Sequence, residues 1–169
     1  MKRNDRILTT HTGSLPRPKN LAEMLVAKDQ GQAYDAATLT QAVRAAVLDI
    51  VRRQLETGID IVDDGEMSKP GYSTYIADRL TGFSGHAPRK PPLDTAGFPE
   101  FNAAMTRMTG PQVLRRSTCT AAVILRDRGP MEADIANLQE AANASGASEM
   151  FMTSASPGLV TAFQPNNFY

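Results

Sequence analysis

Acidic side chains gather around one glycine in the segment Asp60-Ile61-Val62-Asp63-Asp64-Gly65-Glu66. A short apolar run ends there, and a long amphipathic segment that stops at Gly58 comes before it. Sites in α/β proteins lie where strands end, because the loops at that end are free to carry chemistry while the strands stay packed. Carboxylates this close together repel one another and favour a cation or an ammonium group nearby. Glu66 is therefore the first candidate for ligand binding.

The same acidic turn also has a purely structural interpretation. Asp63 or Asp64 could cap the next element while the turn stays solvated, and Lys69 could simply pair with Glu66. The residue types alone leave both interpretations open.

A second candidate loop is His11-Thr12-Gly13-Ser14. Its glycine lets the backbone turn sharply and leaves amide groups free to face an anion. The hydroxyls of Thr12 and Ser14 could help to hold a carboxylate. The alternative is a plain turn after a strand, with a histidine on the surface.

Three further residues deserve a chemical interpretation. Cys119 is the single cysteine, and a lone cysteine is more often a small packing residue than a nucleophile. Zinc sites need three or four clustered ligands, so one cysteine and 2 dispersed histidines exclude a cysteine-rich metal site within these residues. Arg115 and Arg116 could bind an acidic group of a substrate, although a solvated position is the preferred interpretation. We expect no metal ligands in this chain.

Composition and missing motifs narrow the function classes. Lys plus Arg and Asp plus Glu number 18 each, so the net charge of zero argues against a nucleic-acid partner and against charge-based membrane binding. The chain has no apolar run of membrane-spanning length and no apolar centre of a secretion signal after Met1. Phosphate-loop, dinucleotide and hydrolase-elbow motifs are absent. A single cysteine fits a reducing compartment, so we expect a cytoplasmic protein.

The hydrophobic pattern predicts alternating strands and helices in one domain, 1–169. Strands are expected at 7–10, 59–62, 113–120 and 149–153, and helices at 21–28, 38–57, 72–80, 132–144 and 159–163. This alternation predicts an α/β fold with a parallel sheet and helical crossovers. Prolines and glycines are dense over 84–110, which predicts a long loop with little regular structure.

The two longest predicted helices each show one apolar face. In the helix at 38–57 this face holds Leu39, Val43, Ala46, Val47, Ile50 and Val51. Thr38 or Thr40 is expected to cap its start. In the helix at 132–144 the buried face is expected to hold Ile135, Leu138 and Ala142.

Two of these segments resemble a known family. The run from Thr9 to Arg17 resembles the opening strand and loop in the catalytic barrels of cobalamin-independent methionine synthases. The run from Asp63 to Lys69 resembles a second segment of the same barrels, and shorter matches continue in order to Pro165-Asn166. The resemblance covers nearly the whole chain. It is strongest to the short, single-barrel branch, which includes epoxyalkane–coenzyme M transferase-like proteins.

The resemblance implies a fold and a reaction. The fold is a TIM (β/α)8 barrel with ligands at the carboxyl ends of its strands. The reaction uses zinc to bind a substrate thiol as thiolate, which attacks the methyl carbon of a folate donor or, in the coenzyme M branch, an epoxide. By resemblance, Thr12, Gly13 and Ser14 contact the amino-acid part of a homocysteine-like thiol. Glu66 receives its ammonium group, and Arg116 lies near the folate-contacting segment.

The chain departs from the family in its second half. The family's zinc ligands, a His-x-Cys pair, a glutamate and a further cysteine, have no counterpart here. A full barrel needs roughly 250 residues, so the chain is expected to form the N-terminal half of one and to be inactive alone. Unpaired strand edges invite other chains, so we expect a homo-oligomer or a complementary half-barrel as partner. The alternatives are a non-catalytic thiol amino-acid-binding or assembly module, and an epoxyalkane–coenzyme M transferase-like alkyl-thiol transferase.

Overall fold

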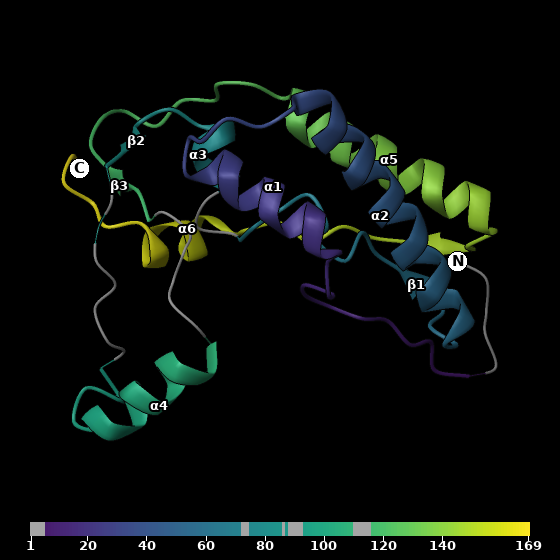
Figure 1. Cartoon of the computed structure of the whole chain (residues 1–169), viewed down its shortest axis with the longest axis horizontal. Coiled ribbons are helices and arrows are strands. Elements are labelled where there is room, and N and C mark those ends of the chain that lie inside the picture. The colour runs from purple at the N-terminus through teal and green to yellow at the C-terminus, as the bar shows by residue number, and fades with distance from the viewer. Residues whose placement is uncertain (1–5, 72–74, 86, 88–92, 110–115) are drawn as a thin grey trace.

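The computed structural model of the chain describes residues 6–71, 75–85, 87, 93–109 and 116–169. The helices of this part are α1 (Lys19–Asp29), α2 (Ala36–Glu56), α3 (Tyr75–Arg79), α4 (Pro99–Thr109), α5 (Gly129–Ser145) and α6 (Pro157–Phe163). The strands are β1 (Ile61–Val62), β2 (Phe83–Ser84), β3 (Thr118–Cys119) and β4 (Glu149–Met150). Figure 1 shows α2 and α5 side by side, with α1 crossing nearby.

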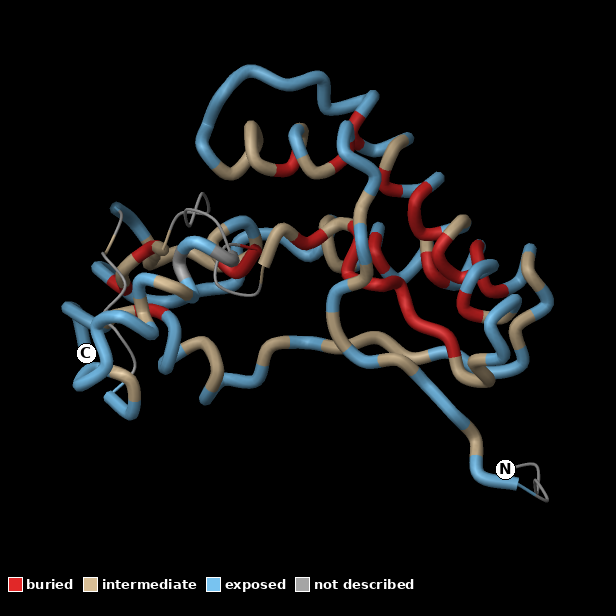
Figure 2. Tube along the Cα trace, turned by 60° about the horizontal axis from the view of Figure 1, so that its bottom comes forward, coloured by how far each residue is buried: buried red, intermediate tan, exposed pale blue. Residues whose placement is uncertain are grey.

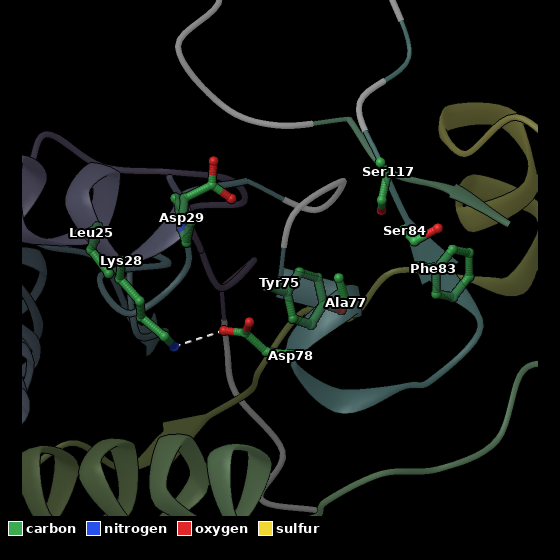
Figure 3. Close-up of a pocket in the computed structure, with 11 residues that line it drawn as sticks. Leu25, Lys28, Asp29, Tyr75, Ala77, Asp78, Phe83, Ser84 and Ser117 are labelled. Atoms are coloured by element: carbon green, nitrogen blue, oxygen red, sulfur yellow. Dashed lines mark hydrogen bonds and ion pairs between the residues drawn. The ribbon is translucent and has the colours of Figure 1, made fainter. Parts of the chain in front are cut away.

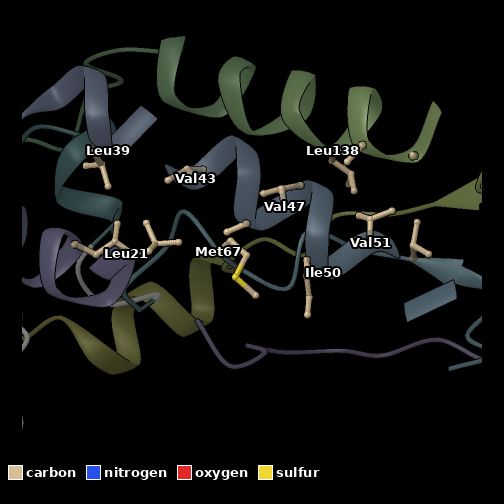
Figure 4. Packing of buried hydrophobic residues seen from close by; sticks show 13 residues of the cluster. Leu21, Leu39, Val43, Val47, Ile50, Val51, Met67 and Leu138 are labelled. Carbon is tan, nitrogen blue, oxygen red and sulfur yellow. The ribbon is translucent and has the colours of Figure 1, made fainter. Parts of the chain in front are cut away.

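The long helix α2 lies at the centre of the hydrophobic core. Its predicted apolar face is confirmed as buried, with side chains from α1 and α5 packed around it (Figure 4). The prediction of its cap was wrong, because the helix begins earlier than expected. The Asp35 carboxylate accepts from the N–H groups of Ala37 (2.9 Å) and Thr38 (3.1 Å), and so satisfies two helix donors that lack a carbonyl partner.

Helix α5 packs along α2 through Leu138, which is 4% exposed, and through Ala141 and Ala142. The prediction for Ile135 was wrong, since its side chain is 39% exposed. Asp134 takes the buried position beside it instead, because it pairs with charged groups from other elements. Figure 2 shows the buried residues gathered on the half of the molecule that these helices occupy.

A short parallel sheet lies under the helices. Strand β1 pairs with β4 in parallel, with Ile61 opposite Glu149 and Val62 opposite Met150. Of the strand predicted at 7–10, only a parallel bridge from Thr10 to Ile61 is present. The three segments therefore lie side by side and run in one direction, as predicted, although each is shorter than expected.

The predicted parallel sheet is confirmed only in part. Strand β2 pairs antiparallel with β3, with Phe83 opposite Cys119. Gly82 permits this approach: its φ is +87°, and a Cβ there would lie 2.6 Å from the carbonyl oxygen of Ala121. Of the strand predicted at 113–120, residues 113–115 lie outside the described residues, as do residues 72–74 of the helix predicted at 72–80. The described part is a mixed α/β fold with a short parallel sheet.

The segment 84–110 contains a helix, which the prediction of a loop missed. Helix α4 begins at Pro99, a residue well suited to the first helical turn. Its neighbour Phe98 and its own Phe101 and Met105 are exposed, and Figure 1 shows the helix lying apart from the others. The density of proline and glycine on either side had hidden this helical spacing. In the described ranges, no helix is both long and apolar enough to cross a membrane.

Candidate functional site

Two loops that are far apart in sequence meet at the carboxyl ends of the parallel segments. The N–H of Leu15 donates to the carbonyl of Gly65 at 3.0 Å, which joins the loop at 11–17 to the turn at 63–69. The Ser14 hydroxyl donates to Oε2 of Glu66. The structure thus brings together two of the side chains that the sequence selected.

A third side chain reaches the same carboxylate from the segment after β4. The Thr153 hydroxyl donates to Oε1 of Glu66 at 3.4 Å. Thr153 was not among the predicted site residues, although its place at the end of the strand predicted at 149–153 was a usable signal. The segment before Ser14 and the segment before Thr153 lie on either side of β1. The hydroxyls of Ser14 and Thr153 therefore face the carboxylate of Glu66, which follows β1 in the chain.

Glu66 has an unusual backbone conformation. Its φ of +56° lies in the left-handed region, which non-glycine residues rarely adopt, and its side chain is 5% exposed. Two contacts hold this backbone. The N–H of Glu66 donates to Oδ1 of Asp64 at 3.0 Å, and a guanidinium nitrogen of Arg17 donates to the Glu66 carbonyl at 2.6 Å. Such conformations persist where the surroundings enforce them, and they cluster at functional sites.

Lys69 pairs with Asp64 and not with Glu66. Its ammonium nitrogen lies 2.5 Å from Oδ2 of Asp64 and 3.9 Å from Oδ2 of Asp134 in α5. Arg79 of α3 also contacts Asp134, at 2.5 Å. Lys69, Asp64 and Asp134 are all buried, so each charge is balanced within the protein. Asp64 thus holds the turn as the structural interpretation expected, but the expectations of a solvated turn and of a pair between Lys69 and Glu66 were wrong.

Asp63 also has a structural task. Its Oδ1 accepts from the N–H of Gly65 at 2.7 Å, while the Gln54 side chain donates to the Asp63 carbonyl at 2.8 Å and accepts from its N–H at 3.1 Å. Burial raises the pKa of Asp63, because water no longer solvates its charged form, and the hydrogen bond from Gly65 opposes this rise. Asp63 and Asp64 therefore shape the turn that presents Glu66.

The other predicted site residues lie at different places around the two loops and α6. Thr12 is exposed, and Gly13 has a φ of +108°, with its carbonyl accepting from the His11 ring at 3.0 Å. Arg116 donates to the carbonyl of Phe163 at the end of α6, so it lies beside that helix and not in the contact between Ser14 and Glu66. Arg115 lies outside the described residues, and Cys119 is buried, as a packing residue would be.

Comparisons with known proteins identify relatives of the chain. No family model matches it. It is 40% identical to a methionine synthase of Sulfolobus acidocaldarius over 75 residues, which are 44% of this chain and 22% of the relative. It is 35% identical to the methionine synthase of Sulfurisphaera tokodaii over 80 residues, 47% of this chain and 23% of the relative.

A solved structure extends the likeness to the fold. The B12-independent methionine synthase from Shewanella sp. W3-18-1, in complex with selenomethionine, matches with a TM-score of 0.65 and 18% identity. The match covers 95% of this chain and 41% of that one. The chain is similar to cobalamin-independent methionine synthases. It spans less than half the length of the structure and about a quarter of the archaeal methionine synthases.

The zinc ion of methionine synthases finds no matching donor set in the described residues. Within them, no group of three His, Cys, Asp or Glu side chains is placed to hold a metal ion. Asp63 and Asp64 of the turn are already bound to backbone amides or to Lys69. The described residues therefore do not fit zinc.

A separate cavity lies between α1, α3 and β2, away from the predicted site residues. Its volume is about 280 Å³, and its lining includes Leu25, Tyr75 and Phe83 (Figure 3). Lys28 and Asp78 form an ion pair at 2.7 Å beside it. The sequence pattern contained no signal for this cavity, because its walls come from segments brought together only by folding.

Proposed function

We propose that this chain supplies the amino-acid-binding side of a methionine-synthase-like site, where a methyl group passes to a homocysteine-like thiol. The observation that carries the proposal is the meeting of Ser14, Glu66 and Thr153 at the ends of adjacent parallel segments. The relatives named methionine synthase and the likeness to a structure solved with selenomethionine support it.

In this proposal each residue has a defined role. Glu66 receives the ammonium group of the amino acid, because Asp64 is already paired and Glu66 is the carboxylate that faces the loop hydroxyls. The exposed Thr12 and the Ser14 hydroxyl, with the backbone at Gly13, receive its carboxylate. Charge-assisted hydrogen bonds of this kind are about twice as strong as neutral ones.

The methyl donor and the metal belong to the same proposal. A folate donor would approach from the side of Arg116, as the resemblance implies. A zinc ion held by ligands outside the described residues would favour the thiolate form of the substrate at neutral pH. Since the described residues hold no donor set for it, methyl transfer is proposed to need ligands from beyond them.

Calorimetry with L-homocysteine and L-methionine tests the binding role. Glu66→Gln removes the charge that the ammonium group meets, and Ser14→Ala removes a hydroxyl, so both should weaken binding. The Glu66 variant should lose roughly tenfold or more, as expected for a hydrogen bond between charged groups. Glu140→Gln, on the exposed face of α5, is the matched control and should bind like the unmodified chain.

Two outcomes would contradict the proposal. One is the absence of amino-acid binding, and the other is binding that neither variant changes. 2-Mercaptoethanesulfonate serves as a competitor, because a sulfonate needs cationic neighbours and Glu66 offers a negative charge. Displacement of the amino acid by this thiol at equal concentration would favour the coenzyme M transferase-like alternative.

The chain's partner is also proposed. Within the described residues, β1 pairs in parallel with β4 and with a single bridge at Thr10, which makes a narrow sheet, whereas parallel sheets are normally wide and covered on both faces. Met150 in β4 is 40% exposed. We propose that a second copy or a complementary half-barrel covers this edge, which would complete a barrel-like sheet.

A further inference from the structure

Arg17 connects the two loops of the site. Its Nη2 donates to the carbonyl of Glu66 at 2.6 Å and to the carbonyl of Lys69 at 2.5 Å. These carbonyls stand at the two ends of the turn at 66–69, while Ser14 lies three residues before Arg17 in the other loop. One guanidinium therefore fixes the backbone of the turn to the loop that carries the serine.

A contribution to folding stability alone does not explain the position of Arg17. Its Nε is buried and has no hydrogen-bond partner among the described residues, which costs free energy. Burial lowers its pKa, because the charged guanidinium loses water, and the charges of Glu66 and Asp64 oppose this only in part. A partly buried cation with an unmet donor suits a group that acts on its neighbours.

Arg17 can affect ligand binding through its charge or through its hydrogen bonds, and these two effects act in opposite directions. Arg17 has the same sign as an ammonium ligand, so its electric field opposes the binding of that ligand near Glu66. Its hydrogen bonds act the other way. They hold the carbonyl of a residue whose left-handed φ of +56° needs support, and so keep the carboxylate beside Ser14.

We propose that Arg17 is a positioning residue: by holding the Glu66 and Lys69 carbonyls, it sets the Glu66 carboxylate for recognition of a ligand ammonium group. This inference rests on the proposed function and deepens it. Arg17 touches neither the thiol nor the amino group of the ligand. It acts through the backbone of the turn.

The test compares two ligands that differ only in the amino group, L-methionine and 4-(methylsulfanyl)butanoate. The ratio of their affinities, measured by calorimetry, reports how well Glu66 recognises the ammonium group. Arg17→Met should lower this ratio roughly tenfold, the size expected for one misplaced charged hydrogen bond. Arg17→Gln keeps one short amide donor and should lower it less. Arg44→Met removes an exposed arginine of α2 and should leave the ratio unchanged.

The outcomes are distinct. If loss of Arg17 only damages the structure, binding of both ligands should weaken equally and the ratio of their affinities should not change. That result would overturn the proposal. A ratio that rises on loss of Arg17 would show that its field dominates, and would overturn it as well. If Arg17→Met does not fold, as judged by circular dichroism, the Arg17→Gln variant decides by the same criterion. If the unmodified chain itself does not distinguish the two ligands, the proposed function fails, and this result is separate from any effect of Arg17.

Discussion

Glu66 differs from its acidic neighbours in what its carboxylate contacts. Asp63 accepts from a backbone amide of the turn, and Asp64 is shared between the Glu66 amide and Lys69. The Glu66 carboxylate instead meets hydroxyls from two other segments. Hydroxyls can turn to serve as donors or acceptors, so such a carboxylate can exchange partners with a ligand at little cost.

The contact of Asp60 with Arg6 and Thr9, just before the loop at 11–17, depends on pH. Its carboxylate accepts from Arg6 and from the Thr9 amide (2.8 Å), and the hydrogen bond from Arg6 is the main reason that its pKa falls from 3.8 to about 2. Because the folded pKa is below the ordinary value, this contact stabilises the fold above about pH 4 and is lost as the pH falls toward 2. Asp60→Asn should therefore lose less stability than the unmodified chain between about pH 5 and pH 2.

Urea unfolding followed by circular dichroism at several pH values measures this difference. Asp94→Asn is a suitable control, since Asp94 is exposed. Parallel pH profiles for the unmodified chain and Asp60→Asn would show that the contact with Arg6 contributes nothing to acid sensitivity.

At the level of elements, burial on α5 depends on its partners and not on its own periodicity. Leu138 faces α2 and is 4% exposed, whereas Ile135, also apolar and one turn earlier, is 39% exposed. Asp134, the residue before Ile135, is buried instead and contacts Lys69 and Arg79. The helix thus combines an apolar contact with α2 and an ionic contact with the turn that carries Glu66.

Leu138→Ala and Ile135→Ala are matched substitutions on the same helix. Leu138→Ala leaves a cavity against α2 and should lower the free energy of unfolding by about 2–5 kcal/mol. Ile135→Ala should change it by less than about 1 kcal/mol, because its side chain already contacts water. Denaturant titration measures both. Equal losses would mean that α5 does not pack on α2 as described.

At the level of the whole molecule, the hydrophobic core lies on the side formed by α1, α2 and α5. Buried hydrophobic residues gather around α2, while Ile124, Leu125 and Phe168 are exposed in the part of the chain around β2 and β3. The likeness to a longer methionine synthase fits this distribution, because the chain matches 41% of that structure. This exposed apolar surface lies around β2 and β3 and not at the edge of β4, where the partner is proposed.

Sedimentation velocity over a range of concentrations tests the association. We expect the sedimentation coefficient to rise with concentration, and Met150→Lys in β4 to weaken the rise by placing a charge at the open edge of the sheet. Leu48→Lys is the matched control, because Leu48 is a similarly exposed apolar residue on α2. A compact monomer at every concentration would argue against a partner at this edge.

The sequence by itself determined the elements whose signals are local. The spacing of apolar residues located α1, α2, α5 and α6, because residues three and four apart share a helix face whatever lies around them. The strand ends and the loop motifs also selected Ser14 and Glu66. The antiparallel pairing of β2 and β3, the pairing of Lys69 with Asp64 and the exposure of Ile135 came only from the tertiary structure. These features depend on which distant segment packs alongside, and the free energy of such contacts is not encoded in any short stretch of chain.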